Sequence, residues 1–212
     1  MFHILSDVKR ERLLGQIGVE IGANVPGARD LLDYVFICKL AREPAIRALV
    51  EPTLGANCFA VRGLFFDKTP DANWLVPRHQ DVTIAVQERH EVEGFGPWST
   101  KDGVPHVQPP REWLESMLSV RLHLDDCDQT NGALRVVAGS HRRGKLSATE
   151  IADWFDLRGE TVVPVPKCGA MIFHPLLIHA SSPSQSLTHR RVVHLEFASR
   201  DLPEGLRWKW KV

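Results

Sequence analysis

The sequence predicts a mainly β protein with flanking helices, built as two stacked antiparallel sheets of the jelly-roll type. From Asn57 onward, short runs rich in β-branched and aromatic residues are separated by Gly, Pro, Asn and Asp, and no regular helices stand between them. This pattern is typical of antiparallel sheets rather than of alternating strands and helices. The glycine-rich nucleotide loops Gly-x-Gly-x-x-Gly and Gly-x-x-x-x-Gly-Lys-Ser/Thr do not occur, which removes the main support for an α/β fold.

Helices are expected first at the start of the chain, over residues 1–55. Within this part, 41–50 places Pro44 near a first helical turn, and the apolar residues after it are spaced for one buried face. A further helix is expected to begin at Ser147, because Ser147-x-x-Glu150 has the spacing of a capping box.

Seven strands are expected in the rest of the chain, at 58–66, 82–87, 117–124, 133–138, 161–164, 169–174 and 191–199. The segment 88–110 carries several glycines and prolines, and we expect it to be a long irregular insert that forms an active-site loop. At 212 residues the chain fits one domain, 1–212, with its β core over 56–200.

The predicted strand 117–124 has two chemically different faces. One face is apolar, and the other carries Ser119, Arg121 and His123. The polar face has two interpretations: it lies against solvent, or it lines a polar cavity between the sheets.

Composition excludes several function classes. Lys plus Arg and Asp plus Glu both number 26, and no long basic run occurs, so nothing indicates nucleic-acid or anionic-membrane partners. The sequence contains neither a signal-peptide pattern at its start nor an apolar stretch that could span a membrane. The cysteines are too scattered for a metal pair or a disulfide framework, which predicts a reduced cytoplasmic setting. They are Cys38, Cys58, Cys127 and Cys168.

The segment 74–83 contains a histidine and an aspartate two residues apart, His79 and Asp81. In a strand these side chains point to the same side. With a distant histidine they would form the two-histidine, one-carboxylate triad of non-haem Fe(II) oxygenases, which leaves positions free for a bidentate cosubstrate and O2. A surface histidine beside a surface aspartate is the alternative.

The segment 169–181 supplies a candidate for that distant histidine. It reads as a Gly turn, a buried strand and then His179, and Arg190 follows eleven residues later. The guanidinium fork of Arg190 is suited to bind the distal carboxylate of 2-oxoglutarate while the oxo-acid end chelates iron. Arg191 is the adjacent alternative, and because side chains alternate along a strand only one of the two can point inward.

Four stretches in this order resemble the phytanoyl-CoA dioxygenase family. They are Phe66-Asp-Lys-Thr-Pro-Asp-Ala-Asn-Trp74, His79-Gln-Asp81, Asn131-Gly-Ala-Leu-Arg-Val-Val-Ala-Gly-Ser-His141 and His174-Pro-Leu-Leu-Ile-His179 with its downstream arginine. The resemblance runs from about Cys58 to Ala198, roughly two-thirds of the chain. It implies a cupin-like double-stranded β-helix that binds Fe(II) and 2-oxoglutarate.

The resemblance also implies roles for individual residues. The implied iron ligands are His79, Asp81 and His179, and the implied 2-oxoglutarate contacts are Arg190, Ser181 and Gln80. Candidate substrate contacts are Asn73, Trp74, Trp98 and His194. Arg121 departs from the family, because relatives often hold an aromatic or apolar residue there. We expect it to bind 2-oxoglutarate, a carboxylate on an acidic substrate, or an internal acid such as Glu196.

The implied reaction is hydroxylation of an unactivated C–H bond in a small-molecule metabolite, with consumption of O2, release of succinate and CO2, and support from ascorbate. Asp81 favours hydroxylation over halogenation, since halogenating relatives lack this carboxylate; desaturation and ring formation stay open. Two alternatives also stay open, a cupin-like metal enzyme that uses no 2-oxoglutarate and a non-catalytic β-helix binding domain. The sequence names neither the substrate nor the oligomeric state.

Overall fold

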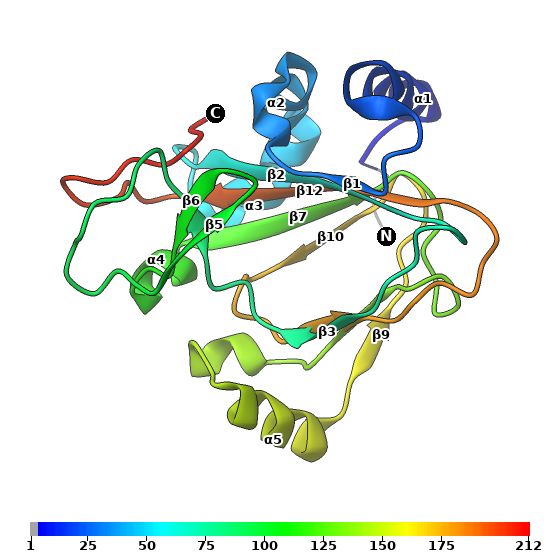
Figure 1. Ribbon diagram of the computed structural model, residues 1–212. Coiled ribbons are helices and arrows are strands. Elements are labelled where there is room, and N and C mark those ends of the chain that lie inside the picture. The colour runs from blue at the N-terminus through cyan, green and yellow to red at the C-terminus, as the bar shows by residue number, and fades with distance from the viewer. Residues whose placement is uncertain (1–3) are drawn as a thin grey trace.

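The computed structural model describes residues 4–212, and its largest element is a five-stranded antiparallel sheet in the order β1-β2-β12-β7-β10 (Figure 1). The strands are β1 Gly27–Ala28, β2 Phe59–Lys68, β12 Arg190–Ala198, β7 Met117–His123 and β10 Ala170–Phe173. The three long strands β2, β12 and β7 are paired along most of their length. Their inward side chains therefore form continuous rows across the sheet.

A second antiparallel sheet faces the first across the interior (Figure 1). Its order is β3-β11-β8-β9, with β3 Val76–His79, β11 His179–Ser181, β8 Leu134–Val136 and β9 Thr161–Val163. Two facing antiparallel sheets confirm the predicted fold class. All seven predicted strands are present, and that at 82–87 is shortened to β4, Ile84–Ala85.

Helices cover the outer face of the larger sheet (Figure 1). They are α1 Asp7–Ile17, the π-helical turn Gly18–Gly22, the 3-10 turn Leu31–Asp33, α2 Val35–Ala41 and α3 Pro44–Leu54. This confirms the helical prediction for the start of the chain, and Pro44 stands in the first turn of α3 as expected. The predicted capping box at Ser147 is also present and begins α5, Ala148–Arg158.

The core between the helices and the sheet depends on strand alternation and on one glycine. Val120 and Leu122 of β7 are fully buried beneath the helices, so the apolar face of this strand is the outer one. Of the two interpretations of its polar face, the structure supports the internal cavity, which Arg121 lines. Gly63 of β2 lies under the 3-10 turn, where an added Cβ would come within 2.9 Å of Leu31 Cβ. The glycine therefore permits this turn to approach the sheet closely.

The insert 88–110 is not irregular throughout, which corrects the expectation from its glycines and prolines. It contains the hairpin of β5, Trp98–Lys101, and β6, Val104–Val107, and β6 also pairs with β4. Asp102 and Gly103 form the turn with φ of 49° and 82°, the left-handed conformation that two-residue hairpin turns require. The Asp102-Gly103 pair is typical of such turns, so the sequence could have predicted this hairpin.

Two short helical elements complete the described chain, α4 Arg111–Glu115 and the 3-10 turn Ser140–Arg143. None of the helices within residues 4–212 is both long and apolar enough to cross a membrane.

Candidate functional site

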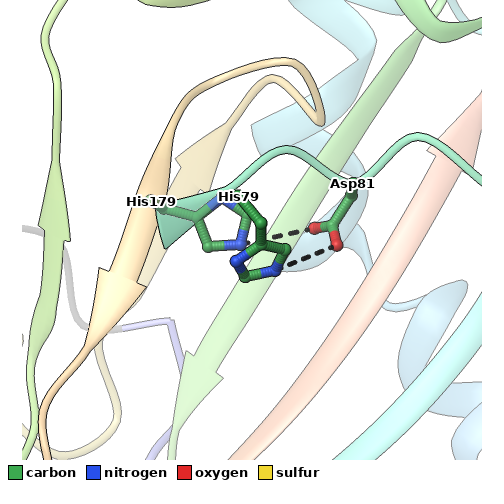
Figure 2. A group of neighbouring side chains, drawn as sticks. All are labelled: His79, Asp81 and His179. Atoms are coloured by element: carbon green, nitrogen blue, oxygen red, sulfur yellow. Dashed lines mark ion pairs between the residues drawn. The ribbon is translucent and has the colours of Figure 1, made fainter. Parts of the chain in front are cut away.

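Three side chains that could hold a metal ion meet at the ends of two strands of the smaller sheet (Figure 2). His79 is the last residue of β3 and His179 the first of β11; the two are paired across the sheet, with ring centroids 4.2 Å apart. Asp81 follows β3, and its Oδ1 lies 3.6 Å from His79 Nε2 and its Oδ2 3.5 Å from His179 Nε2. The fold thus brings together the three residues singled out from the sequence.

Each imidazole is oriented by a backbone carbonyl two residues earlier in the chain. His79 Nδ1 lies 2.8 Å from the carbonyl oxygen of Pro77, and His179 Nδ1 lies 2.9 Å from that of Leu177. Because a carbonyl oxygen only accepts, Nδ1 carries the proton and Nε2 keeps its lone pair. Both lone pairs then face the space beside Asp81, which is the arrangement of metal-ligating histidines.

The charges of these groups suit a cation. Burial alone would raise the pKa of Asp81, but His179 and His79 lower that pKa well below its usual range, so the carboxylate is ionised. Burial lowers the pKa of His179 to about 4 and keeps this imidazole neutral. Burial also opposes protonation of His79, but the hydrogen bond and charge of Asp81 outweigh it, and the His79 pKa is raised. A divalent cation would replace the proton that Asp81 favours on His79.

Two imidazoles and one carboxylate are the donor set of non-haem Fe(II) sites, so the residues present fit this metal. A second group, Asp81, His194 and Glu196, also has donor atoms within 4.8 Å of one another. Glu196, however, forms a buried ion pair with Arg62, whose Nη1 lies 3.1 Å from Glu196 Oε1. That guanidinium would repel a metal ion, so the group with His79 and His179 is the better site.

A cavity of about 360 Å³ lies beside the triad and is lined by side chains from both sheets. This volume is near the lower end of small-molecule sites, which indicates small ligands. Six of the lining side chains are basic, namely Arg29, Arg62, Lys68, Lys101, Arg121 and Arg190. They come from five segments that are far apart in the sequence, with Arg62 and Lys68 both on β2. The cluster as a whole therefore forms only when the chain folds.

Arg190 and Arg191 point to opposite sides of β12, as strand alternation requires. Arg190 lines the pocket and is only 2% exposed, and its Nε and Nη1 are buried without a hydrogen-bond partner. Arg191 instead donates to Asp125, with Nε 2.8 Å from Oδ2 and Nη2 2.7 Å from Oδ1. Burial lowers the pKa of Arg190, yet a guanidinium stays charged at neutral pH. A buried cation without an anion is costly, so Arg190 requires an acidic ligand.

Lys68 lies beside Arg190, which is its partner residue in the neighbouring strand. The Lys68 side chain is fully buried, and Nζ donates to Ser181 Oγ at 2.8 Å and to the Ser182 carbonyl at 2.6 Å. Burial lowers the pKa of Lys68 to about 7, and the charges of Arg190 and Arg121 add to this effect. Arg190 and Lys68 therefore form a positive end of the pocket.

Gly132, in the Asn131-Gly stretch of the sequence, makes room for this end of the pocket. Its carbonyl oxygen accepts a hydrogen bond from Ser181 Oγ at 2.8 Å. Its φ is +83°, and an added Cβ would lie 2.7 Å from the Ser182 carbonyl oxygen and 3.3 Å from Lys68 Nζ. Only glycine fits here without displacing the groups that hold Lys68.

Arg121 projects from β7 into the same pocket and is 7% exposed. Its Nε is buried without a partner, and within residues 4–212 no carboxylate lies at ion-pair distance from its guanidinium. The nearest described interaction is with the Phe66 ring, whose centroid is 5.4 Å from Arg121 Cζ. Glu196 pairs with Arg62 instead, so the alternative of an internal Arg121–Glu196 ion pair is wrong. Burial lowers the pKa of Arg121 to about 9, which leaves it a cation at neutral pH.

The family model for phytanoyl-CoA dioxygenase (PhyH) matches residues 25–192, most of the chain. The chain belongs to the phytanoyl-CoA dioxygenase family. This confirms the resemblance seen in the sequence, and with it the expectation of a double-stranded β-helix fold.

Two relatives show how distant the family members are. The chain is 25% identical over 172 residues to peroxisomal phytanoyl-CoA dioxygenase from Mus musculus, covering 74% of this chain and 44% of that protein. It is also 25% identical over 192 residues to L-proline trans-4-hydroxylase from Streptomyces griseoviridis, covering 78% of this chain and 64% of that protein. This chain therefore spans less than half the length of the mouse relative.

A solved structure shows the same fold at lower identity. The non-haem alpha ketoglutarate-dependent carbocyclase SnoK from nogalamycin biosynthesis superposes with a TM-score of 0.68 at 16% identity. The match covers 93% of this chain and 77% of that one.

Of the four candidate substrate contacts in this family member, two line the pocket and two do not. Trp74 and His194 are lining residues. Asn73 is instead held by Ser184, with Nδ2 2.6 Å from the carbonyl oxygen and Oδ1 2.6 Å from the backbone nitrogen. Trp98 packs in a separate apolar cluster. The predictions for Asn73 and Trp98 are therefore not supported, because both side chains serve local folding.

Gln80 lies at the pocket wall, but its amide is used by the fold. Nε2 donates to the carbonyl oxygens of Gly144 at 2.9 Å and Leu176 at 2.6 Å, and Oε1 accepts from the Leu146 backbone nitrogen at 2.8 Å. Both amide hydrogens are thereby occupied, so Gln80 cannot donate a hydrogen bond to 2-oxoglutarate in this arrangement. It ties the segment between His79 and Asp81 to the 144–146 loop instead.

Four basic pocket residues were missed from the sequence, Arg29, Arg62, Lys68 and Lys101. Arg62 and Lys68 stand an even number of residues apart on one strand, so the sequence could have predicted that they share a face of β2. In the structure this is the inner face. Lys101 was hidden because its segment was interpreted as irregular.

Proposed function

We propose that this member of the phytanoyl-CoA dioxygenase family is an Fe(II)- and 2-oxoglutarate-dependent oxygenase that hydroxylates an unactivated C–H bond of a small-molecule metabolite. The observation that carries the proposal is a two-histidine, one-carboxylate donor set in the same small pocket as the unpaired fork of Arg190. When bound, iron and 2-oxoglutarate together supply the activation of O2 and the oxidation of the C–H bond, with release of succinate and CO2.

The pocket residues divide into two tasks. His79, Asp81 and His179 would hold the metal through Nε2 lone pairs and an ionised carboxylate. Arg190 would hold the distal carboxylate of 2-oxoglutarate with its free nitrogens, supported by Lys68. A dianion placed there compensates two buried cations that otherwise have no acid.

Ser181 would support the distal carboxylate site through Lys68, because its only hydroxyl hydrogen is donated to the Gly132 carbonyl. Its Oγ already joins Lys68 Nζ to the Gly132 carbonyl and so holds the ammonium toward the pocket. Asp81 in the ligand set favours hydroxylation over halogenation, and product mass spectrometry would separate hydroxylation from desaturation or ring formation.

Arg121 would bind a second carboxylate, either the oxo-acid end of 2-oxoglutarate or one on the substrate. Its neighbours favour the first, because Arg190 on the cosubstrate side is the charge that acts on it most strongly. Arg121→Ala should then raise the KM for 2-oxoglutarate by about tenfold or more, the size of one charge-assisted hydrogen bond. A raised KM for the prime substrate alone would assign Arg121 to the substrate, and unchanged kinetics would refute both roles.

Two rival functions make different predictions. A cupin-like metal enzyme that uses no 2-oxoglutarate would bind metal but leave Arg190 without a ligand. A non-catalytic binding domain would show no metal-dependent turnover. The decisive experiment is a screen of small metabolites for substrate-stimulated succinate release and O2 consumption with Fe(II) and ascorbate, with His179→Ala as the inactive control. No succinate release under any condition would refute the proposal.

The cellular setting and partners are part of the same proposal. We place the protein in the cytoplasm, with a small molecule as its partner rather than nucleic acid or membrane. The support is the balanced charge of the sequence and four cysteines that are all free thiols in the structure.

A further inference from the structure

Basic side chains of the pocket lie at both ends of the larger sheet's inner face, and Arg121 lies between them, opposite His194. At one end, Arg190 of β12 stands opposite Lys68 of β2 in the strand register. Six residues further along the same strands, Glu196 stands opposite Arg62. At the usual rise per residue of a strand, the backbones of these two positions are about 20 Å apart. Asp81 of the triad lies near Glu196, since their donor atoms are within 4.8 Å of one another in a group with His194. A 2-oxoglutarate that binds Arg190 with one carboxylate and the metal beside Asp81 with the other has no carboxylate left for Arg62 and its neighbours.

Lys101 joins Arg62 at this second end. It ends strand β5, lines the pocket and donates from Nζ to Thr83 Oγ1 at 2.8 Å. No carboxylate of residues 4–212 lies at ion-pair distance from Lys101 Nζ. Lys101, Arg62 and Arg29 all line the cavity. Burial lowers the pKa of Lys101, Arg62 and Arg29 add to this effect, and Glu196 and Asp81 oppose it.

Arg62 still has free hydrogen-bonding capacity although it pairs with Glu196. The residue is 7% exposed, and among the described residues only Nη1 has a partner, Glu196 Oε1 at 3.1 Å. The other two guanidinium nitrogens keep their donors for a ligand in the pocket. A buried side chain with unused donors thus faces the same space as the Lys101 ammonium.

The pocket as a whole stays positive even when the cosubstrate is bound, and Lys101 is the cation at this end that has no ion pair among the described residues. Among residues 4–212, six basic side chains line the cavity, and Asp81 is the only lining carboxylate. Glu196 and Asp102 neutralise Arg62 and Arg29. A metal dication and a 2-oxoglutarate dianion cancel each other. Three positive charges then remain in excess when Lys68 is protonated, and two when it is not, in a site where unpaired charge is costly.

We propose that the prime substrate is a small organic acid whose carboxylate binds Lys101 and the free donors of Arg62, next to Thr83. This inference rests on the proposed function and names the substrate class for it. An acid anchored there holds the carbon atoms next to its carboxylate beside Asp81, and so close to the metal position. Leu64 and Phe66, which also line the cavity, provide an apolar wall for the carbon skeleton.

Binding of a matched pair of probes tests the inference without catalysis. Isobutyrate and isobutyramide have nearly the same shape, and only the first is charged. We would titrate each by ligand-observed NMR into protein loaded with redox-inert Zn(II) and saturated with 2-oxoglutarate. Isobutyrate should bind about tenfold or more tightly than the amide, as expected for charge-assisted hydrogen bonds. Equal binding of the two probes, or no binding of isobutyrate, would overturn the inference.

Variants of Lys101 test whether the carboxylate of isobutyrate binds at this residue. Lys101→Met should weaken isobutyrate binding by about tenfold and leave the amide unchanged, and Lys101→Arg should restore most of the affinity. Lys211→Met is the matched control, because Lys211 is an exposed lysine that pairs with Asp201 outside the pocket. If Lys101→Met and Lys211→Met behave alike, the acid does not bind at Lys101 and the inference is wrong.

Three further results separate this inference from the function on which it rests. If isobutyrate bound to the Zn(II) protein without 2-oxoglutarate is displaced when 2-oxoglutarate is added, the probe occupies the Arg190 anchor, and the substrate-acid site is refuted. If Fe(II)-loaded wild-type protein releases succinate from 2-oxoglutarate while acid and amide bind alike, the oxygenase function stands and only the substrate class fails. Absence of all 2-oxoglutarate turnover would refute the function itself.

Discussion

The binding of 2-oxoglutarate should depend on pH through the buried amine of Lys68. Its pKa in the empty pocket is about 7, lowered from 10.5 chiefly by burial and then by Arg190 and Arg121. A carboxylate bound beside it would raise that pKa again. At pH 8 the free protein carries a proton on Lys68 in only about one molecule in ten, so binding should take up about 0.9 proton per 2-oxoglutarate.

The sign of this effect sets the pH window. Below pH 7 Lys68 is already charged, and binding takes up little proton. Above pH 7 each bound dianion must bring a proton with it, so affinity should fall by about tenfold per pH unit until the pKa of the bound state is reached. Between pH 7 and 10.5 the unfolded chain also binds more protons than the folded one at Lys68, so the free energy of unfolding of the empty protein should rise with pH.

Calorimetry in buffers of different ionisation enthalpy measures this proton uptake directly. The protein would be loaded with Ni(II) and titrated with 2-oxoglutarate at pH 6 and at pH 8. Lys68→Met keeps a buried chain of similar length without the charge, and it should abolish the uptake at pH 8. Uptake close to zero in the wild type, or uptake that persists in Lys68→Met, would show that Lys68 does not titrate on binding.

Three further predictions concern the metal, the cosubstrate anchor and the fold. Ala in place of His79 or Asp81 should abolish metal retention and turnover at unchanged circular dichroism, and full activity in either variant would refute the ligand set. Arg190→Lys should raise the KM for 2-oxoglutarate by about tenfold or more, because an ammonium replaces a two-pronged donor, whereas Arg191→Lys should change only the Tm; the reverse pattern would contradict the register. Gly132→Ala should lower the free energy of unfolding by about 1–3 kcal/mol through backbone strain and a steric clash, and an unchanged urea midpoint would contradict this reasoning.

Local periodicity was enough to predict part of the site. Alternation along β7 placed Arg121 opposite the apolar face, and the structure shows that face buried under the helices. The same rule required that only one of Arg190 and Arg191 point inward. Asp125 decides which, because it binds Arg191 on the far side of the strand. Sequence alone could not supply this partner, since it stands 66 residues away from Arg191.

The roles of amide side chains, which both donate and accept hydrogen bonds, were the hardest to predict from the sequence. Asn73 and Gln80 stand next to the metal motif and carry donors suited to a ligand. In the fold their amides bind backbone groups that lie far away in sequence, at Ser184 and at Gly144, and so hold loops instead. An amide satisfies neighbouring backbone groups as readily as a ligand, so proximity in sequence to a metal ligand does not assign it a role. Arginine inside a pocket is more informative, because few internal groups can neutralise it.

This difference explains why the side chains that line the pocket are themselves evidence about its ligands. Arg190 and Arg121 are almost fully buried and carry donors without acceptors in the described chain. A protein gains no stability from such cations, since each loses hydration without gaining a counter-ion. The loss is recovered only when anions bind, so acidic ligands should stabilise this protein strongly, by an amount that grows with the logarithm of their concentration. The buried guanidinium groups that lower the stability of the ligand-free protein are thus the same groups that select acidic ligands.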